Sequence, residues 1–174
     1  MNPILQFYLN DDRIRDQLGF THKNFINGTD EWLEDCHGHI QWAFPMEVPS
    51  MVLMQNTPIL TPEVIESFKN SNDLRTKLSQ SYTRMWNFYF NETVEFENDC
   101  FIYKTSLTQW ITPRNHNFLR LTRMIRSLRM LGLPEAATHL YKKLCDIYAD
   151  ERYTSIIGPV TKNFWDNAYV ESFD

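Results

Sequence analysis

The chain has 174 residues, of which 43% are hydrophobic, 14% aromatic and 22% charged, and these values exclude a disordered protein. The length favours one domain that can bury a sizeable core. The formal net charge of −5 excludes a chain-wide basic field that would attract nucleic acid, so any anion-binding surface has to be local.

The cysteines and the N-terminus indicate an intracellular protein. Cys36, Cys100 and Cys145 are an odd, sparse set without C-x-x-C spacing, as expected for reduced thiols. No apolar run approaches the roughly 20 residues that span a bilayer. The start, MNPILQFYLNDD, lacks the basic n-region of a signal peptide. We expect a cytoplasmic protein without membrane contact; a nuclear location also fits a eukaryotic source.

Short elements are expected in the first thirty residues. Residues 3–9 fit either a helical turn or an extended arm, and residues 11–18 fit a short helix. Residues 21–27 are expected to form a loop, and Asn27-Gly28 is a strong turn signal.

The next segment predicts a helix and then an extended passage. Thr29 is a suitable N-cap for a helix from Asp30 to about Trp42, which Gly38 interrupts. Prolines then mark residues 45–58 as a long extended segment that wraps the core.

The middle of the chain contains one clear core helix. Thr61-Pro62 is typical of a helix start, and residues 74–90 carry an apolar stripe at helical spacing. Residues 91–113 fit a short hairpin or an irregular loop, with a minor β element expected near residues 94–103.

The C-terminal part contains the strongest amphipathic helix, residues 116–131, with Gly132 as its C-cap. Pro134 opens a further helix to about residue 150, and residues 152–174 fit one more short helix. We therefore predict a mainly α, single-domain bundle of about six helices with a long extended proline-rich segment and a minor β-hairpin.

Two blocks combine aromatic, polar and basic residues. The first, Leu33 to Pro45, reads L-E-D-C-H-G-H-I-Q-W-A-F-P, and the second, His116 to Leu128, reads H-N-F-L-R-L-T-R-M-I-R-S-L. Both resemble the conserved region of the opioid growth factor receptor family. The resemblance covers about residues 7–148 of one domain, 1–174, and leaves 149–174 as a C-terminal extension.

The resemblance implies a helical domain. For the animal members it also implies binding of enkephalin-type peptides at the nuclear periphery. Those proteins are much longer and have repeat-rich tails, so we do not carry opioid binding over to this chain.

Four arginines, Arg120, Arg123, Arg126 and Arg129, recur every three residues in the second block. His116, Arg120 and Arg123 lie at i, i+4 and i+7 and so share one side of a helix. Guanidinium groups suit bidentate recognition of phosphate or carboxylate. The alternative is a solvated face that pairs with acids of neighbouring helices.

The first block has a matching polar side. Glu34, His37 and Gln41 fall at i, i+3 and i+7 of the expected helix, next to Trp42. Such a group can hold a planar or anionic ligand, with the indole stacking on it. The alternative is an internal polar network that satisfies the arginines or the loop backbone.

Metal and thiol chemistry have weaker support. Cys36, His37 and His39 resemble zinc ligands in type, but their spacing is poor, and we expect no metal and no cofactor. Catalysis by Cys36, Cys100 or Cys145 stays open, because a base can come from a distant part of the chain.

Our leading hypothesis is that segments 32–45 and 116–131 pack together around one site. The chain would then be a non-enzymatic binding module for a small anionic ligand (a nucleotide, a phosphate or an acidic peptide) or for a protein partner. The expected ligand-binding residues are His37, Gln41, Trp42, His116, Arg120 and Arg123.

Two alternatives belong to other classes. The first is an enzyme acting on a phosphorylated or nucleic-acid-linked substrate, with His37 or His116 as the acid or base. The second is nucleic-acid binding through the arginines of residues 120–129, which the acidity of the chain disfavours. The sequence does not indicate an oligomeric state.

Overall fold

The computed structural model describes residues 2–9, 21–48, 58–90, 92–97, 100–105 and 110–171, without the side chains of the two strands. This part of the chain contains nine helices around one hydrophobic core and one pair of strands, which confirms the mainly α fold. The number exceeds six because the helix expected over residues 30–42 is two helices, and because residues 3–8 and 22–27 also form helices. The elements are α1 Pro3–Tyr8, α2 His22–Asn27, α3 Asp30–Asp35, α4 His39–Ala43, α5 Pro62–Asn70, α6 Asn72–Phe90, β1 Glu92–Glu97, β2 Cys100–Thr105, α8 Asn117–Met130, α9 Pro134–Ala149 and α10 Glu151–Val170.

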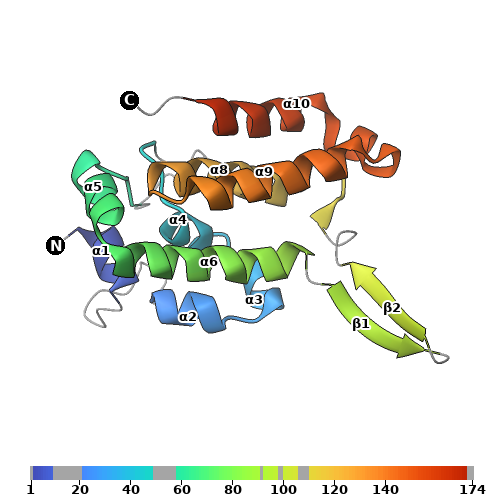
Figure 1. The fold of residues 1–174 in the computed structure, drawn as a ribbon, viewed down its shortest axis with the longest axis horizontal. Helices are drawn as coiled ribbons and strands as arrows, with labels where there is room; N and C mark the ends of the chain where they lie inside the picture. Colours follow the sequence, from blue (N-terminus) through green and yellow to red (C-terminus); the bar gives the residue numbers. More distant parts are fainter. Residues whose placement is uncertain are drawn as a thin grey trace.

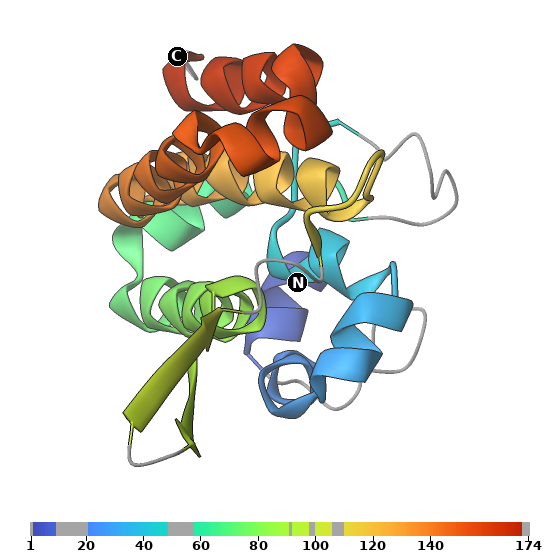
Figure 2. The ribbon, with the colours of Figure 1, turned by 90° about the vertical axis from the view of Figure 1, so that its right-hand side faces the viewer.

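The long helices form layers (Figure 1). Helix α10 covers α8 and α9, which also pack against each other. Helices α1, α2 and α5 pack against α6 on the other side of the molecule. Figure 2 shows the same layers end-on, with the hairpin extending away from the helices. Within the described residues, no helix has both the length and the apolar character needed to cross a membrane.

The hairpin confirms the minor β element expected near residues 94–103. Strands β1 and β2 pair antiparallel, with Glu92 opposite Thr105 and Glu97 opposite Cys100.

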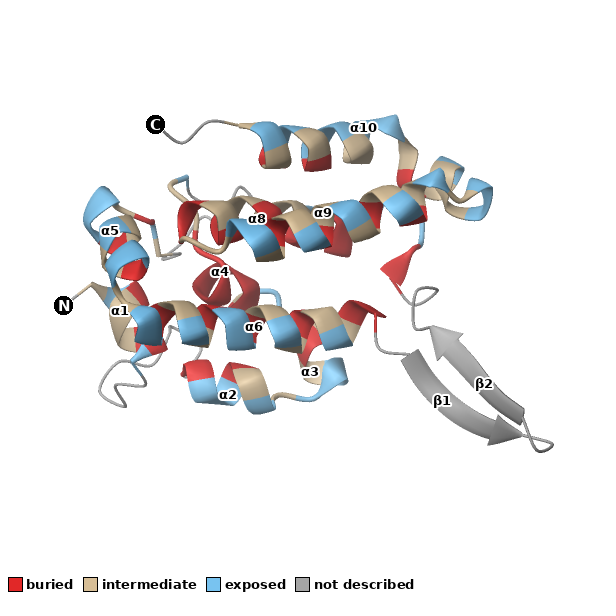
Figure 3. Cartoon of the chain, viewed as in Figure 1, coloured by how far each residue is buried: buried red, intermediate tan, exposed pale blue. Residues whose placement is uncertain are grey.

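Helix α4 lies at the centre of the fold. All of its residues are buried, as Figure 3 shows, and it packs beneath α8. The apolar stripe of α8 faces the same core, with Phe118, Leu121, Ile125 and Leu128 each at most 5% exposed. The amphipathic pattern of the second block therefore predicted its buried face correctly.

The single helix expected from Asp30 to Trp42 was wrong. Helix α3 ends at Asp35, Cys36 has an extended backbone (φ −86°, ψ 103°), and α4 begins at His39. The physical reason is burial. All five residues of α4 are buried, whereas α3 is largely exposed, so one straight helix could not place both segments correctly.

The loop expected at residues 21–27 is helix α2. The Thr21 hydroxyl accepts a hydrogen bond from the Asn24 backbone N–H, while the Asn24 side-chain oxygen Oδ1 accepts one from the Thr21 N–H at 2.9 Å. This is a capping box in which asparagine replaces the usual glutamate or glutamine, so the signal was missed. Of the two readings of residues 3–9, the helical one is confirmed by α1, which Asn2 caps.

Other boundaries follow the sequence signals closely. Helix α5 begins at Pro62 as expected, and Gly132, with φ 86°, ends α8. Helix α6 begins two residues before Leu74, and the Ser71 hydroxyl caps it by accepting a hydrogen bond from the Leu74 N–H. The expected short helix near the C-terminus is the longer α10, which turns at Gly158 (φ 75°, ψ 161°).

Two expectations concern chain segments with little or no description. The short helix expected at residues 11–18 lies outside the described residues. Of the extended passage, residues 49–57 also lie outside them, while Met46 and Ile59 form a parallel β-bridge that brings its two ends together.

Two buried histidines make the fold sensitive to acid. His39 lies between the rings of Phe25 and Trp32, with centroid distances of 5.3 and 5.0 Å. Burial lowers the pKa of His39 to about 3, and the positive charge of Arg120 adds to this effect. Burial likewise lowers the pKa of His22 to about 4. Both imidazoles are therefore neutral in the folded protein near neutral pH.

Acidification should destabilise the protein, and His39→Phe should weaken that dependence. The unfolded imidazole has its ordinary pKa of 6.5, so the unfolded chain binds more protons as the pH falls from 6.5 towards 3. Between pH 7 and pH 5, His39 should lower the free energy of unfolding by about 2 kcal/mol. Urea denaturation of both proteins at the two pH values measures this difference. An equal loss of stability in the variant would contradict the assignment.

Candidate site at the junction of α3 and α8

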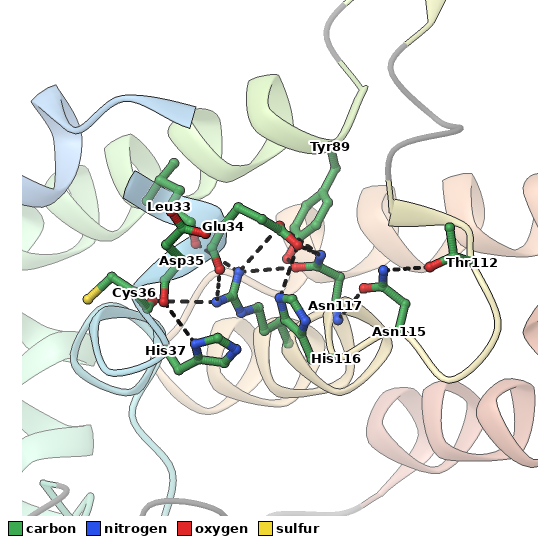
Figure 4. Close-up of polar contacts among 11 residues, drawn as sticks. Leu33, Glu34, Asp35, Cys36, His37, Tyr89, Thr112, Asn115, His116 and Asn117 are labelled. Atoms are coloured by element: carbon green, nitrogen blue, oxygen red, sulfur yellow. Dashed lines mark hydrogen bonds and ion pairs between the residues drawn. The ribbon is translucent and has the colours of Figure 1, made fainter. Parts of the chain in front are cut away.

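The two blocks singled out in the sequence are neighbours in the fold. The end of α3 and the turn that follows it lie against the first turns of α8 (Figure 4). The polar side chains drawn in Figure 4 come from these two segments, from Tyr89 at the end of α6 and from the loop before α8.

Glu34 connects α3 to the start of α8. Its Oε2 accepts a hydrogen bond from Asn117 Nδ2 at 3.0 Å, and its Oε1 lies 3.3 Å from His116 Nε2. The Arg120 guanidinium is 4.0 Å from Oε2. The Glu34 side chain is 41% exposed, so a molecule in solution can still reach the carboxylate.

Asn117 is the hub of the buried half of the junction. Its side-chain oxygen accepts hydrogen bonds from the Tyr89 hydroxyl at 2.9 Å and from Arg120 Nη1 at 3.2 Å, while its Nδ2 donates to Glu34. Asn117 is 0% exposed, so its donor and acceptor groups depend on these partners. Sequence reasoning missed this role, although an amide beside His116 in the second block was a signal that could have indicated it.

Tyr89 was also missed, because its position in the apolar stripe of α6 indicated only a core residue. Its ring is fully buried, but its hydroxyl reaches Asn117, and its backbone oxygen accepts a hydrogen bond from Trp110 Nε1 at 2.9 Å. Burial raises the pKa of Tyr89 far above its ordinary value, so the hydroxyl stays a donor.

His37 and His116 form the exposed half of the junction. Their ring centroids are 4.8 Å apart, and His37 Nδ1 lies 2.9 Å from the carbonyl oxygen of Asp35, to which it can donate. Burial lowers the pKa of His116, the charge of Arg120 adds to this effect, and Glu34 opposes it. The His37 ring is exposed and the His116 side chain is 36% exposed, so both rings can contact a bound molecule, although His116 Nε2 itself is buried.

Arg120 is 5% exposed and its guanidinium is used inside the protein. Nη1 donates to the carbonyl oxygen of Leu33 at 2.8 Å, and Nη2 donates to those of Glu34 at 3.2 Å and Cys36 at 3.4 Å. These carbonyls lie at the C-terminal end of α3, and the last carbonyls of a helix have no hydrogen-bond donor within the helix. The geometry matches the internal network that was the alternative interpretation of the first block.

The other arginines of α8 are also engaged. Arg123 Nη1 donates to the carbonyl oxygen of Phe44 at 3.1 Å, just beyond α4. Burial lowers the pKa of Arg123 to about 10, with Glu47 opposing the shift, so its charge persists at neutral pH. Arg126 pairs with Glu47 and with Glu171. The arginine side chains of α8 thus point largely into the molecule.

Gln41 and Trp42 do not lie at the junction. Both belong to α4 and are 5% and 7% exposed, and the Trp42 ring packs 5.9 Å from that of Phe7. Because α3 and α4 are separate helices, the shared side expected for Glu34, His37 and Gln41 does not exist. Of the six expected residues, the junction contains His37, His116 and Arg120.

A hollow of about 450 Å³ opens beside Glu34. Four carboxylates and two aromatic rings line it; Asp30 is paired with Arg84 at 2.7 Å, while Glu31 and Asp35 are exposed. Its lining residues are Asp30, Glu31, Glu34, Asp35, Phe88 and Trp110. Sequence reasoning missed this hollow, since Phe88 and Trp110 are brought to α3 only by the fold. In the described part of the chain, no three His, Cys, Asp or Glu side chains are arranged to hold a metal ion.

Comparison with known proteins places this junction within a family. Residues 2–155 match the family described as the opioid growth factor receptor conserved region. The chain belongs to this family. The resemblance drawn from the two blocks is therefore confirmed, and both segments that build the junction lie within the matched residues.

Several curated relatives belong to the opioid growth factor receptor family. The chain is 33% identical to the human opioid growth factor receptor over 137 residues, which is 75% of this chain and 20% of that protein. It is 30% identical to the rat receptor over 74% of this chain and 23% of the relative. It is 28% identical to opioid growth factor receptor-like protein 1 of Xenopus tropicalis over 74% of this chain and 25% of the relative.

The chain thus matches about a fifth to a quarter of the length of these relatives. No solved structure matches the chain.

Replacement of Arg120 by methionine should destabilise the fold strongly. It would remove the Arg120 donor from the carbonyl oxygens of Leu33, Glu34 and Cys36, and the Asn117 side-chain oxygen would keep only the Tyr89 hydroxyl. The free energy of unfolding should fall by about 3 kcal/mol. Urea denaturation measures the change. Arg126→Met is a matched control on the same helix, and we expect it to cost about 1 kcal/mol or less because its ion pairs are partly exposed. Similar losses for both variants would contradict the role given to Arg120.

Proposed function

We propose that this member of the family is a non-enzymatic binding module that holds a protein partner over the junction of α3 and α8. One observation carries the proposal, namely the group formed by Glu34, His37 and His116, which two distant segments bring together and leave accessible. The aromatic and acidic hollow lies directly beside this group. Exposed polar groups next to a concave surface are typical of recognition sites.

The charges favour a partner that offers lysine or arginine side chains. Glu31 and Asp35 are exposed at the rim of the hollow, and Glu34 is partly exposed. The arginines that were expected to hold an anion, Arg120 and Arg123, already donate to backbone carbonyls. An anionic ligand would have to rely on the two histidines, so it is the competing prediction and not the leading one.

The names of the relatives support binding in a general sense. They describe the human and rat proteins as receptors for an opioid growth factor. We carry over to this chain only the property of binding another molecule, because the match covers a small part of those proteins.

Isothermal titration with two kinds of probe should separate the two ligand classes. A hexalysine peptide should bind, with an affinity that falls steeply as salt is added, because exposed charge pairs are screened. ATP and inorganic phosphate should show no measurable heat of binding. Binding of ATP or phosphate without binding of the peptide would overturn the proposal in favour of an anionic ligand.

A charge-matched pair of variants tests the position of the site. Glu31→Gln with Asp35→Asn removes two carboxylates from the hollow and should weaken hexalysine binding by roughly fivefold or more. Glu63→Gln with Asp146→Asn removes two exposed carboxylates elsewhere and should change it much less. Equal effects of the two double variants would show attraction by net charge alone and would sink the assignment to α3.

A further inference from the structure

The last helix of the chain has two parts that meet at a hinge. Gly158 has φ 75° and ψ 161°, and Pro159 begins a second helical stretch, residues 159–170. A Cβ at Gly158 would meet no atom within 4 Å, so the turn itself faces open space. The match to the family ends at residue 155, before the hinge. Residues 159–171, called the added helix below, lie beyond the matched region.

The added helix lies across α8 and α9, both of which belong to the matched region. Its anchor is Trp165, which is 0% exposed. The Trp165 ring meets the Phe118 ring edge-on at 6.1 Å, and its Nε1 donates to the carbonyl oxygen of Phe118 at 3.2 Å. Helix α8 therefore offers both an apolar and a polar contact to one indole.

Helix α9 contributes a second set of contacts. The Tyr141 ring stacks on the Tyr169 ring at 4.1 Å with an interplanar angle of 7°, and the Tyr141 hydroxyl donates to Asp166 Oδ1 at 2.7 Å. Lys162 pairs with the same carboxylate. These side chains lie on the face of the added helix that also carries Trp165, so the helix is amphipathic in its contacts.

The end of the added helix is fixed by α8. Arg129 Nη1 donates to the carbonyl oxygens of Ala168 at 3.1 Å and Glu171 at 2.7 Å, and Arg126 pairs with the Glu171 carboxylate at 2.5 Å. Arginines near the last carbonyls of a helix define its direction as well as its position. The surface of α8 and α9 thus selects a helix of one polarity.

The outer face of the added helix differs from that of α9. Val160, Phe164 and Val170 are 68%, 48% and 69% exposed and form an uncharged outer face with neighbouring amides. The outer face of α9 is polar and mostly charged; its exposed side chains include Glu135, His139, Lys142 and Asp146. A helix with apolar residues on both sides is suited to more than one packing partner.

We propose that α8 and α9 form a groove for an amphipathic helix and that residues 159–171 are its own hinged occupant. The partner that fits has a tryptophan and a tyrosine four residues apart on one face and ends its helix beside Arg129. A helix of this kind from another molecule binds when the hinged segment swings out. This groove is a second surface, separate from the junction of α3 and α8.

A labelled peptide of residues 159–171, PVTKNFWDNAYVE, is the direct probe, titrated against the full chain by fluorescence anisotropy. Wild type should bind it weakly, because the tethered segment competes at high effective concentration. Trp165→Ala in the chain loosens the tethered segment and leaves the groove intact, so peptide affinity should rise roughly tenfold or more. The same peptide with alanine in place of its tryptophan should bind neither protein.

The neighbouring residue supplies a matched control. Phe164→Ala truncates an aromatic side chain on the outer face of the same helix and should leave peptide affinity at the wild-type level. A Trp165→Ala protein that keeps its helical circular dichroism but binds no more peptide than wild type would overturn the proposal.

Hydrogen exchange of the wild-type chain is an independent readout that needs no variant. The amides of residues 160–170 should exchange together and faster than those of α9, because the hinged segment opens without global unfolding. An excess of the unlabelled peptide should increase their exchange further. Exchange of both helices at one common rate, unaffected by the peptide, would show that the segment is ordinary core and would refute the groove.

Discussion

The structure depends on arginine side chains that close the C-terminal ends of helices belonging to other parts of the chain. Arg120 donates to carbonyls at the end of α3, Arg123 to the one after α4, and Arg129 to those at the end of α10. Arg84 donates to Gly28 after α2, and Arg75 to Phe68 in α5. The last carbonyls of a helix have no partners within it and carry partial negative charge, so a guanidinium satisfies both needs at once. Short helices that are weak by themselves gain fixed ends in this way.

This use of arginine decides what remains available for function. Three of the four arginines of α8 are spaced along the helix so that each reaches a different helix end, and Arg126 pairs with two acids instead. A stripe that has the composition of an anion site is therefore mainly an internal scaffold. What stays at the surface of the junction is the carboxylate and imidazole group of Glu34, His37 and His116, whose surroundings are acidic. The same arginines thus hold the site in place and leave its outward charge negative.

Helix α8 contacts both the N-terminal helices of the matched region and the added helix. Helix α8 faces α3 and α4 with Arg120 and Arg123 and faces α10 with Arg129, so it separates two surfaces of different chemistry. One surface is polar and acidic, and the other is a contact between helices built on Trp165. A change at α8 would therefore reach both, because the buried network around Asn117 leaves little freedom for its first turns.

The sequence alone determined most of the helices, because their signals act within one or two helical turns and do not depend on the fold. These signals are the proline that starts α5, the glycine that ends α8 and the apolar stripes of α6 and α8. The two family blocks also identified which segments meet. Tertiary structure decided the break between α3 and α4, because only the demand to bury α4 on every side forces it. Tertiary structure also determined which partner each polar side chain has. Whether Arg120 meets a ligand or a carbonyl depends on what lies 3 Å from its guanidinium, and those atoms belong to residues more than eighty positions away.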